Sequence, residues 1–538
     1  MGRAMTSGGN GRRVGYGVRP SREPVAAGPV TETQVAGPEG AVGPRPRATI
    51  ALDVRRRLGT VDPRIYGGFV ENLGRCIYGG IFEEGSALSD ERGFRRDVTD
   101  AIRRLHPPVM RWGGNFISGY HWTDGIGPRD QRPRRWDRAW QAEESNRFGT
   151  DEFIEFCRLI GAEPFICCNM GTGTLDEAMS WVEYCNGRGA TEWAERRRRN
   201  GHSKPHEVRY WGLGNEVYGP WEIGAMSADE YVRRARELAK GLLATDSDIE
   251  LISSGELGWS EWDRVVIDGL AAVVQWHSIH IYTGSEDYHR NVLMPHQVER
   301  ALDLCRALIE RTRYLQRIAH PVHIAYDEWN QWFRQSSVAH HEERYSLADA
   351  LAVATFLNAF VRHSGSVRMA NLAQMVNVIA PIVTSPDGLF LQTIYHPLRL
   401  FAEHMQGAVL DVAVDAPTID LRGREPNDGG HRVADLGPFP VLDVSATVDG
   451  EERLLTMATV NRDRNHAIAT EIAMPGLSAE GEATVYEVNG GSPEATNSFE
   501  QPEAVAVTGR QLRWSGGLRH LFPAHSITVM RIPLSRSG

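Results

Sequence analysis

Val208-Arg-Tyr-Trp-Gly-Leu-Gly-Asn215-Glu216 and Val322-His-Ile-Ala-Tyr-Asp327-Glu328 are the two stretches that decide the fold. Each is an apolar, aromatic or β-branched run that ends on a glutamate, which is typical of a buried strand followed by a polar residue. An α/β barrel carries its chemistry at the carboxyl ends of such strands. Two carboxylates on different strands are also what the cleavage of a glycosidic bond requires.

Outward from these two stretches, predicted strands alternate with amphipathic helices. Eight runs have strand character: 65–69, 108–112, 163–170, 208–216, 249–254, 274–282, 322–328 and 369–375. Eight strand–helix units over about 320 residues predict a (β/α)8 barrel, the TIM barrel. A doubly wound open sheet is the alternative, but no glycine-rich phosphate loop follows the first strand.

Helix start signals support this alternation. Thr150 is expected to cap a helix at 151–160, and Gly161 is expected to end it. Thr174 and Ser227 are each followed three residues later by a glutamate, which is the pattern of a capping box.

The pattern changes after about residue 405. Short alternating runs at 441–448, 453–460 and 526–532 are separated by Gly, Pro and Asp, which predicts an antiparallel, jelly-roll-like β-sandwich. An alternating run at 48–54 precedes the barrel and can pair into the same sheet. We therefore expect a disordered tail (1–47), a sandwich strand (48–64), a catalytic barrel (65–404) and a C-terminal β-sandwich (405–538).

Composition restricts the class of ligand. The chain has 538 residues and a formal net charge of -10, which argues against nucleic acid or an anionic membrane as the partner. No run of 18 apolar residues occurs, so no membrane span is expected. The N-terminal region lacks the apolar segment of a secretory signal, so a cytoplasmic location is the default. The six cysteines contain no CxxC pair, which fits reduced thiols.

The two glutamates suit distinct chemical roles. Glu216 can protonate a leaving oxygen if an apolar site and a nearby negative charge raise its pKa. Asn215 can bind a sugar hydroxyl beside the reacting carbon, and Trp329 and Trp332 near Glu328 suit stacking on a sugar. The alternatives are a strand-end carboxylate that caps a helix, and a core tryptophan cluster with an incidental glutamate.

Longer motifs carry a family resemblance. They occupy 65–80 (IYGGFVENLGRCIYGG), 111–128 (RWGGNFISGYHWTDGIGP), 212–221 (GLGNEVYGPW), 278–282 (SIHIY), 327–330 (DEWN) and 373–381 (AQMVNVIAP). From about Ala48 to near its C-terminus, the chain resembles the α-L-arabinofuranosidases of glycoside hydrolase family 51. That resemblance implies a (β/α)8 barrel with a β-sandwich built from the C-terminal segment and an N-terminal strand.

The resemblance also implies site residues. Glu216 matches the acid/base, Glu328 the nucleophile, Asn215 the residue that holds the sugar 2-hydroxyl, and Arg111 an arginine beside the nucleophile. The remaining matches bind the furanose or line the cleft: Glu71, Asn115, Gln374, His280, Tyr282, Trp122 and Trp221. No cofactor and no metal are implied, the partner is an oligosaccharide, and a homo-oligomer (a hexamer by family analogy) is expected.

Two departures from the family pattern leave the sugar open. Arg111-Trp-Gly-Gly-Asn115 is one residue shorter than the family motif and lacks its proline, and the 169–174 segment has a glycine where the family has an arginine. Another furanosidase, an endo-glucanase or a xylosidase therefore remain alternatives, as does a sugar-binding protein without catalysis. Residue-level alternatives are a Glu71–Arg111 salt bridge at the barrel bottom, a zinc ligand at His280 and a core amide at Gln374.

The sequence as a whole predicts a retaining exo-glycosidase. It would remove terminal non-reducing α-L-arabinofuranosyl residues from arabinan or arabinoxylan oligosaccharides by double displacement. A retaining mechanism requires the Glu216 and Glu328 carboxyl groups to lie about 5–5.5 Å apart.

Overall fold

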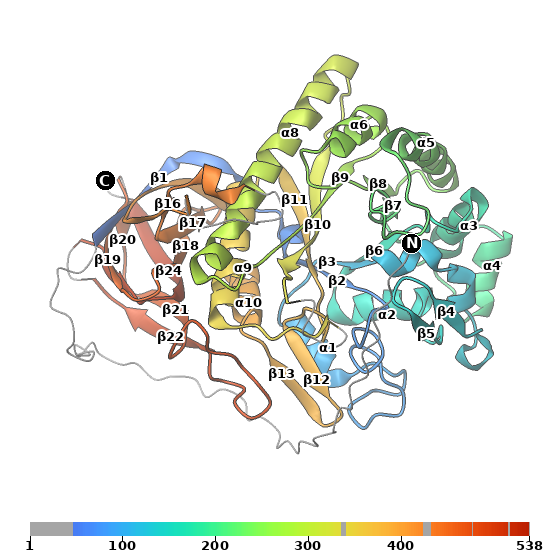
Figure 1. Ribbon diagram of the computed structural model, residues 1–538, viewed down its shortest axis with the longest axis horizontal. Coiled ribbons are helices and arrows are strands. Elements are labelled where there is room, and N and C mark those ends of the chain that lie inside the picture. Colours follow the sequence, from blue (N-terminus) through green and yellow to red (C-terminus); the bar gives the residue numbers. More distant parts are fainter. Residues whose placement is uncertain (1–46, 335–340, 423–431, 476, 515–516, 537–538) are drawn as a thin grey trace, which may run out of the picture.

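The computed structural model describes residues 47–334, 341–422, 432–475, 477–514 and 517–536. The tail expected at 1–47 lies, apart from Arg47, outside the described residues. Figure 1 shows the two parts of the molecule, with a helix-covered barrel on the right and a β-sheet domain on the left.

Eight parallel strands close into a barrel, which confirms the TIM-barrel prediction and rules out the open sheet. Each predicted strand is present, although several are shorter than their apolar runs. In barrel order they are β2 (Gly67–Val70), β3 (Val109–Trp112), β6 (Glu163–Cys167), β7 (Tyr210–Leu213), β8 (Glu250–Ser253), β9 (Trp276–Thr283), β10 (His323–Gln331) and β11 (Val367–Ala373).

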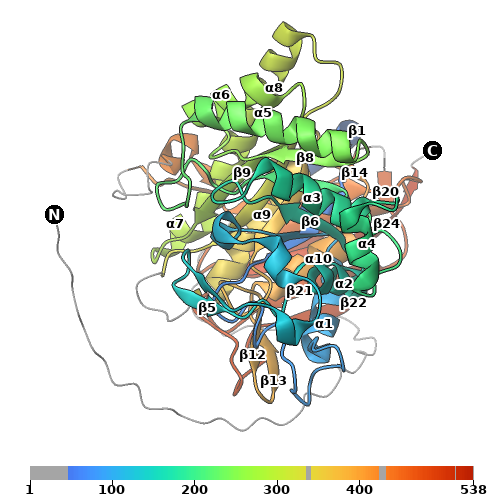
Figure 2. The same cartoon turned by 90° about the vertical axis from the view of Figure 1, so that its right-hand side faces the viewer.

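Helices surround the barrel and bury apolar faces against it (Figure 2). The helix starts predicted at Thr174 and Ser227 are confirmed, because each side chain accepts the backbone N–H of the glutamate three residues on, but these helices lack the return bond of a full capping box. The cap at Thr150 is wrong: Gly149 is the N-cap, and the Thr150 hydroxyl instead accepts a 3.0 Å hydrogen bond from Trp181. The helices are α1 (Arg96–Arg103), α2 (Thr150–Ile160), α3 (Leu175–Asn186), α4 (Glu192–Arg199), α5 (Ala228–Thr245), α6 (Glu261–Leu270), α7 (Tyr288–Leu293), α8 (Gln297–Gln316), α9 (Leu347–Arg362) and α10 (Tyr395–His404).

The second part is a ten-stranded, mostly antiparallel sheet with its own apolar core. The N-terminal strand belongs to it as expected, between β14 and β19, but its pairing with β19 is parallel. The strands are β1 (Arg47–Thr60), β14 (Ala408–Asp415), β17 (Leu442–Val448), β18 (Leu454–Asn461), β19 (Ile468–Ala473), β20 (Leu477–Ala479), β21 (Ala483–Asn489), β22 (Ala506–Leu512), β23 (Arg519–Phe522) and β24 (Ser526–Arg536).

Helix α9 joins the two parts. Its neighbours include β10 of the barrel and β17 of the sheet, and nearly all of its side chains are buried. Val460 and Ile527 of the sheet belong to the same apolar cluster as the barrel interior. The sheet therefore packs on the barrel through a continuous core.

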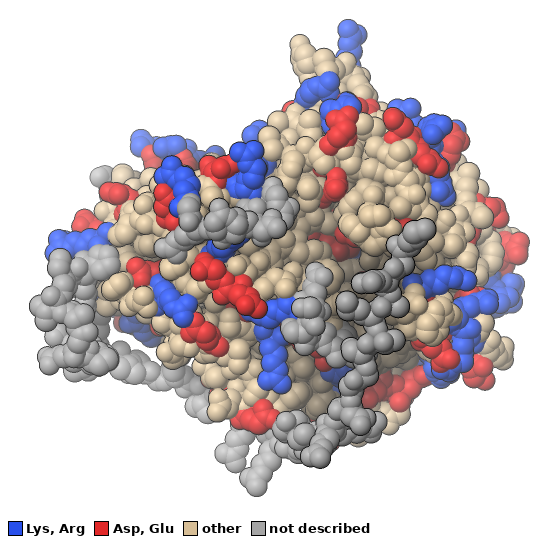
Figure 3. All heavy atoms as spheres, in the orientation of Figure 1, with Lys and Arg blue, Asp and Glu red and all other residues tan. Residues whose placement is uncertain are grey.

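Three two-stranded antiparallel sheets lie outside these two parts: β4 (Arg135–Asp137) with β5 (Ala142–Glu144), β12 (Ile382–Ser385) with β13 (Gly388–Leu391), and β15 (Thr418–Ile419) with β16 (Phe439–Pro440). Acidic and basic side chains are interspersed over the face in Figure 3, without a large basic patch. Within the described residues, every helix is too short or too polar to cross a membrane.

Candidate active site

The predicted site residues meet where the barrel strands end. Arg111 lies in β3, His280 and Tyr282 lie in β9, and Glu328 lies in β10. Glu216 follows β7 by three residues, after a turn in which Gly214 has a φ of 93° and Glu216 itself a φ of 40°. Such left-handed backbone is unusual for a glutamate and is often found at functional sites.

Glu328 is held on both oxygens. The Arg111 guanidinium places Nη1 2.5 Å from Glu328 Oε1, and the Tyr282 hydroxyl donates a 2.7 Å hydrogen bond to Oε2. Arg111 Nε also lies 3.2 Å from Asp327 Oδ2. Because Arg111 and Glu328 are both buried, the pair balances charge in a dry site and fixes the direction of the carboxylate.

Glu216 is held in the same way by two N–H donors. Its Oε1 is 2.9 Å from His280 Nδ1, and its Oε2 accepts a 2.9 Å hydrogen bond from Trp221 Nε1. Trp221 is 58% exposed, so this side of the site opens to solvent.

His280 lies among three carboxylates. Its Nε2 is 3.3 Å from Asp327 Oδ1, and its Nδ1 is 3.5 Å from Glu328 Oε1 in addition to the Glu216 contact. Burial by itself would lower the pKa of His280, but the carboxylates outweigh it and raise that pKa to about 10. His280 therefore carries a positive charge at neutral pH.

This charge corrects one expectation about Glu216. Burial pushes the pKa of Glu216 upward, but the hydrogen bond from His280 and its charge push it further downward, so the pKa lies below its ordinary value. A raised pKa was expected from an apolar site with a neighbouring anion, and the cationic imidazole was not foreseen. In this state the shared proton resides on His280 Nδ1, 2.9 Å from Glu216.

The carboxylates of Glu216 and Glu328 face each other. An oxygen of Glu216, a ring nitrogen of His280 and an oxygen of Glu328 all lie within 4.8 Å of one another. Both carboxylates can therefore reach the same reacting atom of a bound substrate.

Glu71 is another buried carboxyl group with several hydrogen-bond partners. Its Oε1 accepts hydrogen bonds from the Phe116 backbone (3.0 Å) and from Trp140 Nε1 (2.7 Å), and its Oε2 accepts one from Gln374 Nε2 (3.2 Å). Burial holds the pKa of Glu71 well above its ordinary range. Gly114, with a φ of 78°, is required here, because a Cβ atom would lie 2.3 Å from the Glu71 carboxyl carbon. Among the described residues Glu71 therefore makes no salt bridge with Arg111, and Gln374 is not an isolated core amide.

Asn215 links Arg111, the partner of Glu328, to Asn115 and Glu222. Its Oδ1 accepts a 2.6 Å hydrogen bond from Arg111 Nη2, while its Nδ2 donates to Asn115 Oδ1 at 3.1 Å and to Glu222 Oε1 at 2.8 Å. The shortened 111–115 segment thus still brings Asn115 to Asn215.

Trp122 does not line the cleft, contrary to expectation. It is 1% exposed, its Nε1 donates to the Glu177 carbonyl at 2.9 Å, and its ring stacks on Trp181 at 5.9 Å. The motif that carries Trp122 lies in a short 3-10 helix (Trp122–Gly125) that packs under α3. Its large ring therefore fills the core.

Three contributors were missed. Asp327 reaches Arg111 and His280 because the β9–β10 register shifts between Ala325 and Glu328, so that two adjacent acidic residues face the site. Trp140 arrives from the β4–β5 hairpin and Glu222 from the segment after Trp221. Only the Asp-Glu pair in β10 offered a sequence signal; the other two are long-range contacts.

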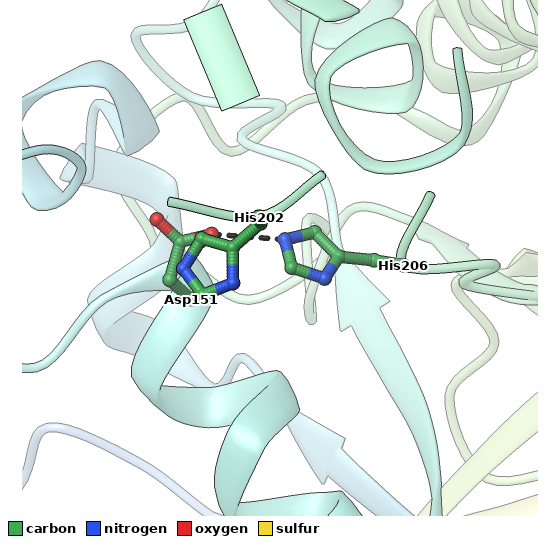
Figure 4. A group of neighbouring side chains, drawn as sticks. All are labelled: Asp151, His202 and His206. Carbon is green, nitrogen blue, oxygen red and sulfur yellow. Dashed lines mark hydrogen bonds and ion pairs between the residues drawn. The ribbon is translucent and has the colours of Figure 1, made fainter. Parts of the chain in front are cut away.

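Arg111 already pairs with Glu328, and a metal ion at the group formed by Glu216, His280 and Glu328 would have to displace the proton of His280. A second group, Asp151, His202 and His206, also has ligand-type atoms within 4.8 Å (Figure 4). Arg158 lies 3.5 Å from His206 Nδ1, and its charge opposes a bound cation.

That second group has a structural role. His206 Nε2 lies 2.9 Å from Asp151 Oδ1, and the Tyr184 hydroxyl donates to Oδ2 at 2.7 Å. These bonds tie the start of α2 to the segment that precedes β7 and to α3.

A (β/α)8 barrel with two facing glutamates at its strand ends, one paired with arginine and one with a protonated imidazole, defines a glycoside hydrolase. Comparison with known proteins agrees. Residues 101–300 match the family model described as alpha-L-arabinofuranosidase 1 domain, and residues 327–526 match the alpha-L-arabinofuranosidase C-terminal domain.

Individual relatives extend over most of the chain. Alpha-L-arabinofuranosidase C of Emericella nidulans is 41% identical over 501 residues, covering 90% of this chain and 97% of the relative. The intracellular exo-alpha-(1->5)-L-arabinofuranosidase of Streptomyces lividans is 36% identical over 496 residues, covering 87% and 72%. The crystal structure of the Thermotoga maritima alpha-L-arabinofuranosidase in complex with arabinose has a TM-score of 0.84 and 41% identity, covering 90% and 100%.

The chain belongs to the α-L-arabinofuranosidases of glycoside hydrolase family 51. These matches favour the arabinofuranosidases over the endo-glucanases, xylosidases and inactive sugar-binding proteins that the sequence left open.

Proposed function

We propose that the protein is an exo-acting α-L-arabinofuranosidase that works with retention of configuration. It removes terminal non-reducing arabinofuranosyl residues from short arabinan or arabinoxylan oligosaccharides. The observation that supports retention most is the approach of Glu216 and Glu328 oxygens to within 4.8 Å. Retaining enzymes hold their carboxyl groups about 5–5.5 Å apart, whereas inverting enzymes need about 6.5–9.5 Å to admit a water.

In the first step Glu328 attacks the anomeric carbon. The C1–O bond to the leaving group breaks while a bond from C1 to a Glu328 oxygen forms, and Glu216 passes a proton to the leaving oxygen. Arg111 orients the attacking carboxylate. The proton held on His280 Nδ1 lies 2.9 Å from Glu216 Oε1, so it reaches the leaving oxygen through Glu216.

In the second step water attacks C1 from the face that the leaving group occupied. Glu216, now ionised, accepts the water proton, and the bond between C1 and Glu328 breaks. The Tyr282 hydroxyl, 2.7 Å from Glu328 Oε2, stabilises the departing carboxylate. Return of the water proton from Glu216 to His280 Nδ1 restores the starting states of Glu216, His280 and Glu328.

Recognition of the sugar falls to the remaining polar residues. We assign the furanose hydroxyls to Glu71, Asn115 and Gln374, and the 2-hydroxyl to Asn215. Because Asn115 still contacts Asn215 at 3.1 Å, the shortened segment leaves the furanose contacts in reach. We assign stacking on the leaving group to Trp221, which is 58% exposed beside Glu216.

We further propose that the enzyme acts in the cytoplasm on imported oligosaccharides and forms a homo-oligomer. The Streptomyces lividans relative is named as intracellular, which supports the location. Fractionation of the source cells and light scattering of the purified protein test these two points.

A panel of 4-nitrophenyl glycosides tests the substrate. We expect the α-L-arabinofuranoside to have the highest kcat/KM, and Glu328→Ala to lose this activity while the protein stays folded. A higher kcat/KM for a xyloside or glucoside would refute the choice of sugar. Binding without turnover by the wild type would identify a sugar-binding protein instead.

A further inference from the structure

Glu222 is a buried carboxyl beside the catalytic pair that the mechanism above leaves without a role. It is 6% exposed and follows Trp221, the residue that donates to Glu216. Its Oε1 accepts a 2.8 Å hydrogen bond from Asn215 Nδ2. Its Oε2 is buried without a hydrogen-bond partner among the described residues.

The contacts of Asn215 determine which way its amide points. Arg111 Nη2 can only donate, so the Asn215 atom 2.6 Å away is the oxygen Oδ1. The two hydrogens of Nδ2 then face Asn115 Oδ1 and Glu222 Oε1. Glu222 is therefore one of the two acceptors that keep this amide from turning over.

Charge balance around Glu222 favours its neutral form. The buried cations of the site, Arg111 and His280, already make ion pairs with Asp327, Glu328 and Glu216. Among the described residues none forms an ion pair with Glu222. The titratable groups that face it are carboxylates, namely Glu216 and Glu328 and, at longer range, Glu71.

The pKa of Glu222 also favours the neutral form. Burial raises the pKa of Glu222 to about 8, the nearby Ser118 hydroxyl and the hydrogen bond from Asn215 oppose this rise, and repulsion from Glu216 and Glu328 adds a smaller upward effect. An ionised carboxylate with one oxygen unpaired would be costly at this depth, whereas a neutral carboxyl group is tolerated.

We propose that Glu222 is a positioning residue that, as a neutral hydrogen-bonding group, holds the Asn215 amide in the orientation required by the sugar 2-hydroxyl. This role rests on the proposed function, because the 2-hydroxyl contact belongs to it. Hydrogen bonds to the 2-hydroxyl strengthen in the transition state, so a misdirected amide lowers kcat more than it raises KM.

Two variants and two substrates test the role. Glu222→Gln keeps the shape, the neutral charge and an acceptor, whereas Glu222→Met keeps the length but has no acceptor of comparable strength. Their kcat and KM are measured with 4-nitrophenyl α-L-arabinofuranoside and with its 2-deoxy analogue, and their melting temperatures with calorimetry. Asn215→Ala serves as the reference for complete loss of the contact.

We expect Glu222→Gln to keep kcat within about twofold of wild type. Glu222→Met should lower kcat on the full substrate by about tenfold or more, with KM changed less than about threefold. On the 2-deoxy substrate the same variant should lose less than about twofold, because the contact that it disturbs is already absent.

Equal losses on both substrates would show that Glu222 is only structural. A loss in Glu222→Gln as large as in Glu222→Met would show that the negative charge is needed, and a fully active Glu222→Met would show that the contact is irrelevant. These results presuppose a wild type that hydrolyses the full substrate. A wild type without that activity would overturn the proposed function together with this role.

Discussion

Arg111 Nη1 lies 2.5 Å from Glu328 Oε1, and the same guanidinium reaches Asn215 and Asp327. One planar cation therefore orients the nucleophile and the residue assigned to the 2-hydroxyl. Lysine keeps the charge but cannot present several N–H groups in this fixed fork. We expect Arg111→Lys to lower kcat/KM by about 100-fold, measured with 4-nitrophenyl α-L-arabinofuranoside.

The control for this variant is its stability. A lysine still supplies a buried cation, so Arg111→Lys should unfold at a temperature near that of wild type. Arg111→Met leaves Asp327 and Glu328 without their guanidinium partner and should lose about 3–5 kcal/mol of unfolding free energy. An Arg111→Lys enzyme within threefold of wild-type activity would contradict the orienting role.

His280 predicts a pH dependence of stability. Its pKa is raised from 6.5 to about 10 in the folded protein, so its stabilising effect is fully present below pH 6.5 and is lost as the pH rises through about 10. The pKa values of Glu216 and Asp327 are lowered, so their contributions are present above their ordinary values of 4.5 and 3.8 and are lost as the pH falls. The cluster is therefore most stabilising between about pH 4.5 and 6.5.

Urea unfolding of wild type and His280→Gln at pH 6 and at pH 9.5 measures this effect. The variant should be less stable than wild type at pH 6, and the difference should shrink at pH 9.5. A difference that stays constant or grows with pH would mean that His280 is not held as a cation.

Trp221 and Trp136 offer a matched pair of substitutions. Both rings are 58% exposed, but only Trp221 donates to Glu216. We expect Trp221→Phe to lower kcat/KM by about tenfold through loss of that hydrogen bond to a carboxylate, with little change in melting temperature. Trp136→Phe should leave both quantities unchanged, and equal effects of the two variants would remove Trp221 from the mechanism.

Glu328 can be tested as the nucleophile by chemical rescue. In Glu328→Gly the space of the carboxylate admits azide, which should attack C1 directly while Glu216 still protonates the leaving oxygen. We expect azide to restore at least about tenfold activity and to yield the β-arabinofuranosyl azide, identified by NMR. Rescue without a glycosyl azide would argue against attack at C1 from the position of Glu328.

Much of the barrel could be predicted because its strands are continuous apolar runs bounded by polar residues. The runs that end at Glu216 and Glu328 are examples, although β7 stops at Leu213 and a glycine turn with positive φ carries the chain on to Glu216. The predicted N-cap at Thr150 is wrong, since its hydroxyl accepts a hydrogen bond from Trp181, which is distant in the sequence.

The site was less predictable where a residue's role depends on distant partners. Trp122 and Trp221 both follow glycine-rich motifs, but Trp122 is buried under α3, whereas Trp221 is exposed beside Glu216. The lowered pKa of Glu216 follows from His280, 64 residues away in the chain, and Glu222 gains a role only because Asn215 is turned toward it.

The proposed mechanism depends above all on retention at C1 by Glu216 and Glu328. The most direct measurement is proton NMR of the product formed when the wild type cleaves 4-nitrophenyl α-L-arabinofuranoside in buffer with methanol, because the methyl glycoside does not change its anomeric form in solution. Retention predicts methyl α-L-arabinofuranoside as the transfer product. Methyl β-L-arabinofuranoside, or release of arabinose with inverted configuration and no transfer product, would contradict it.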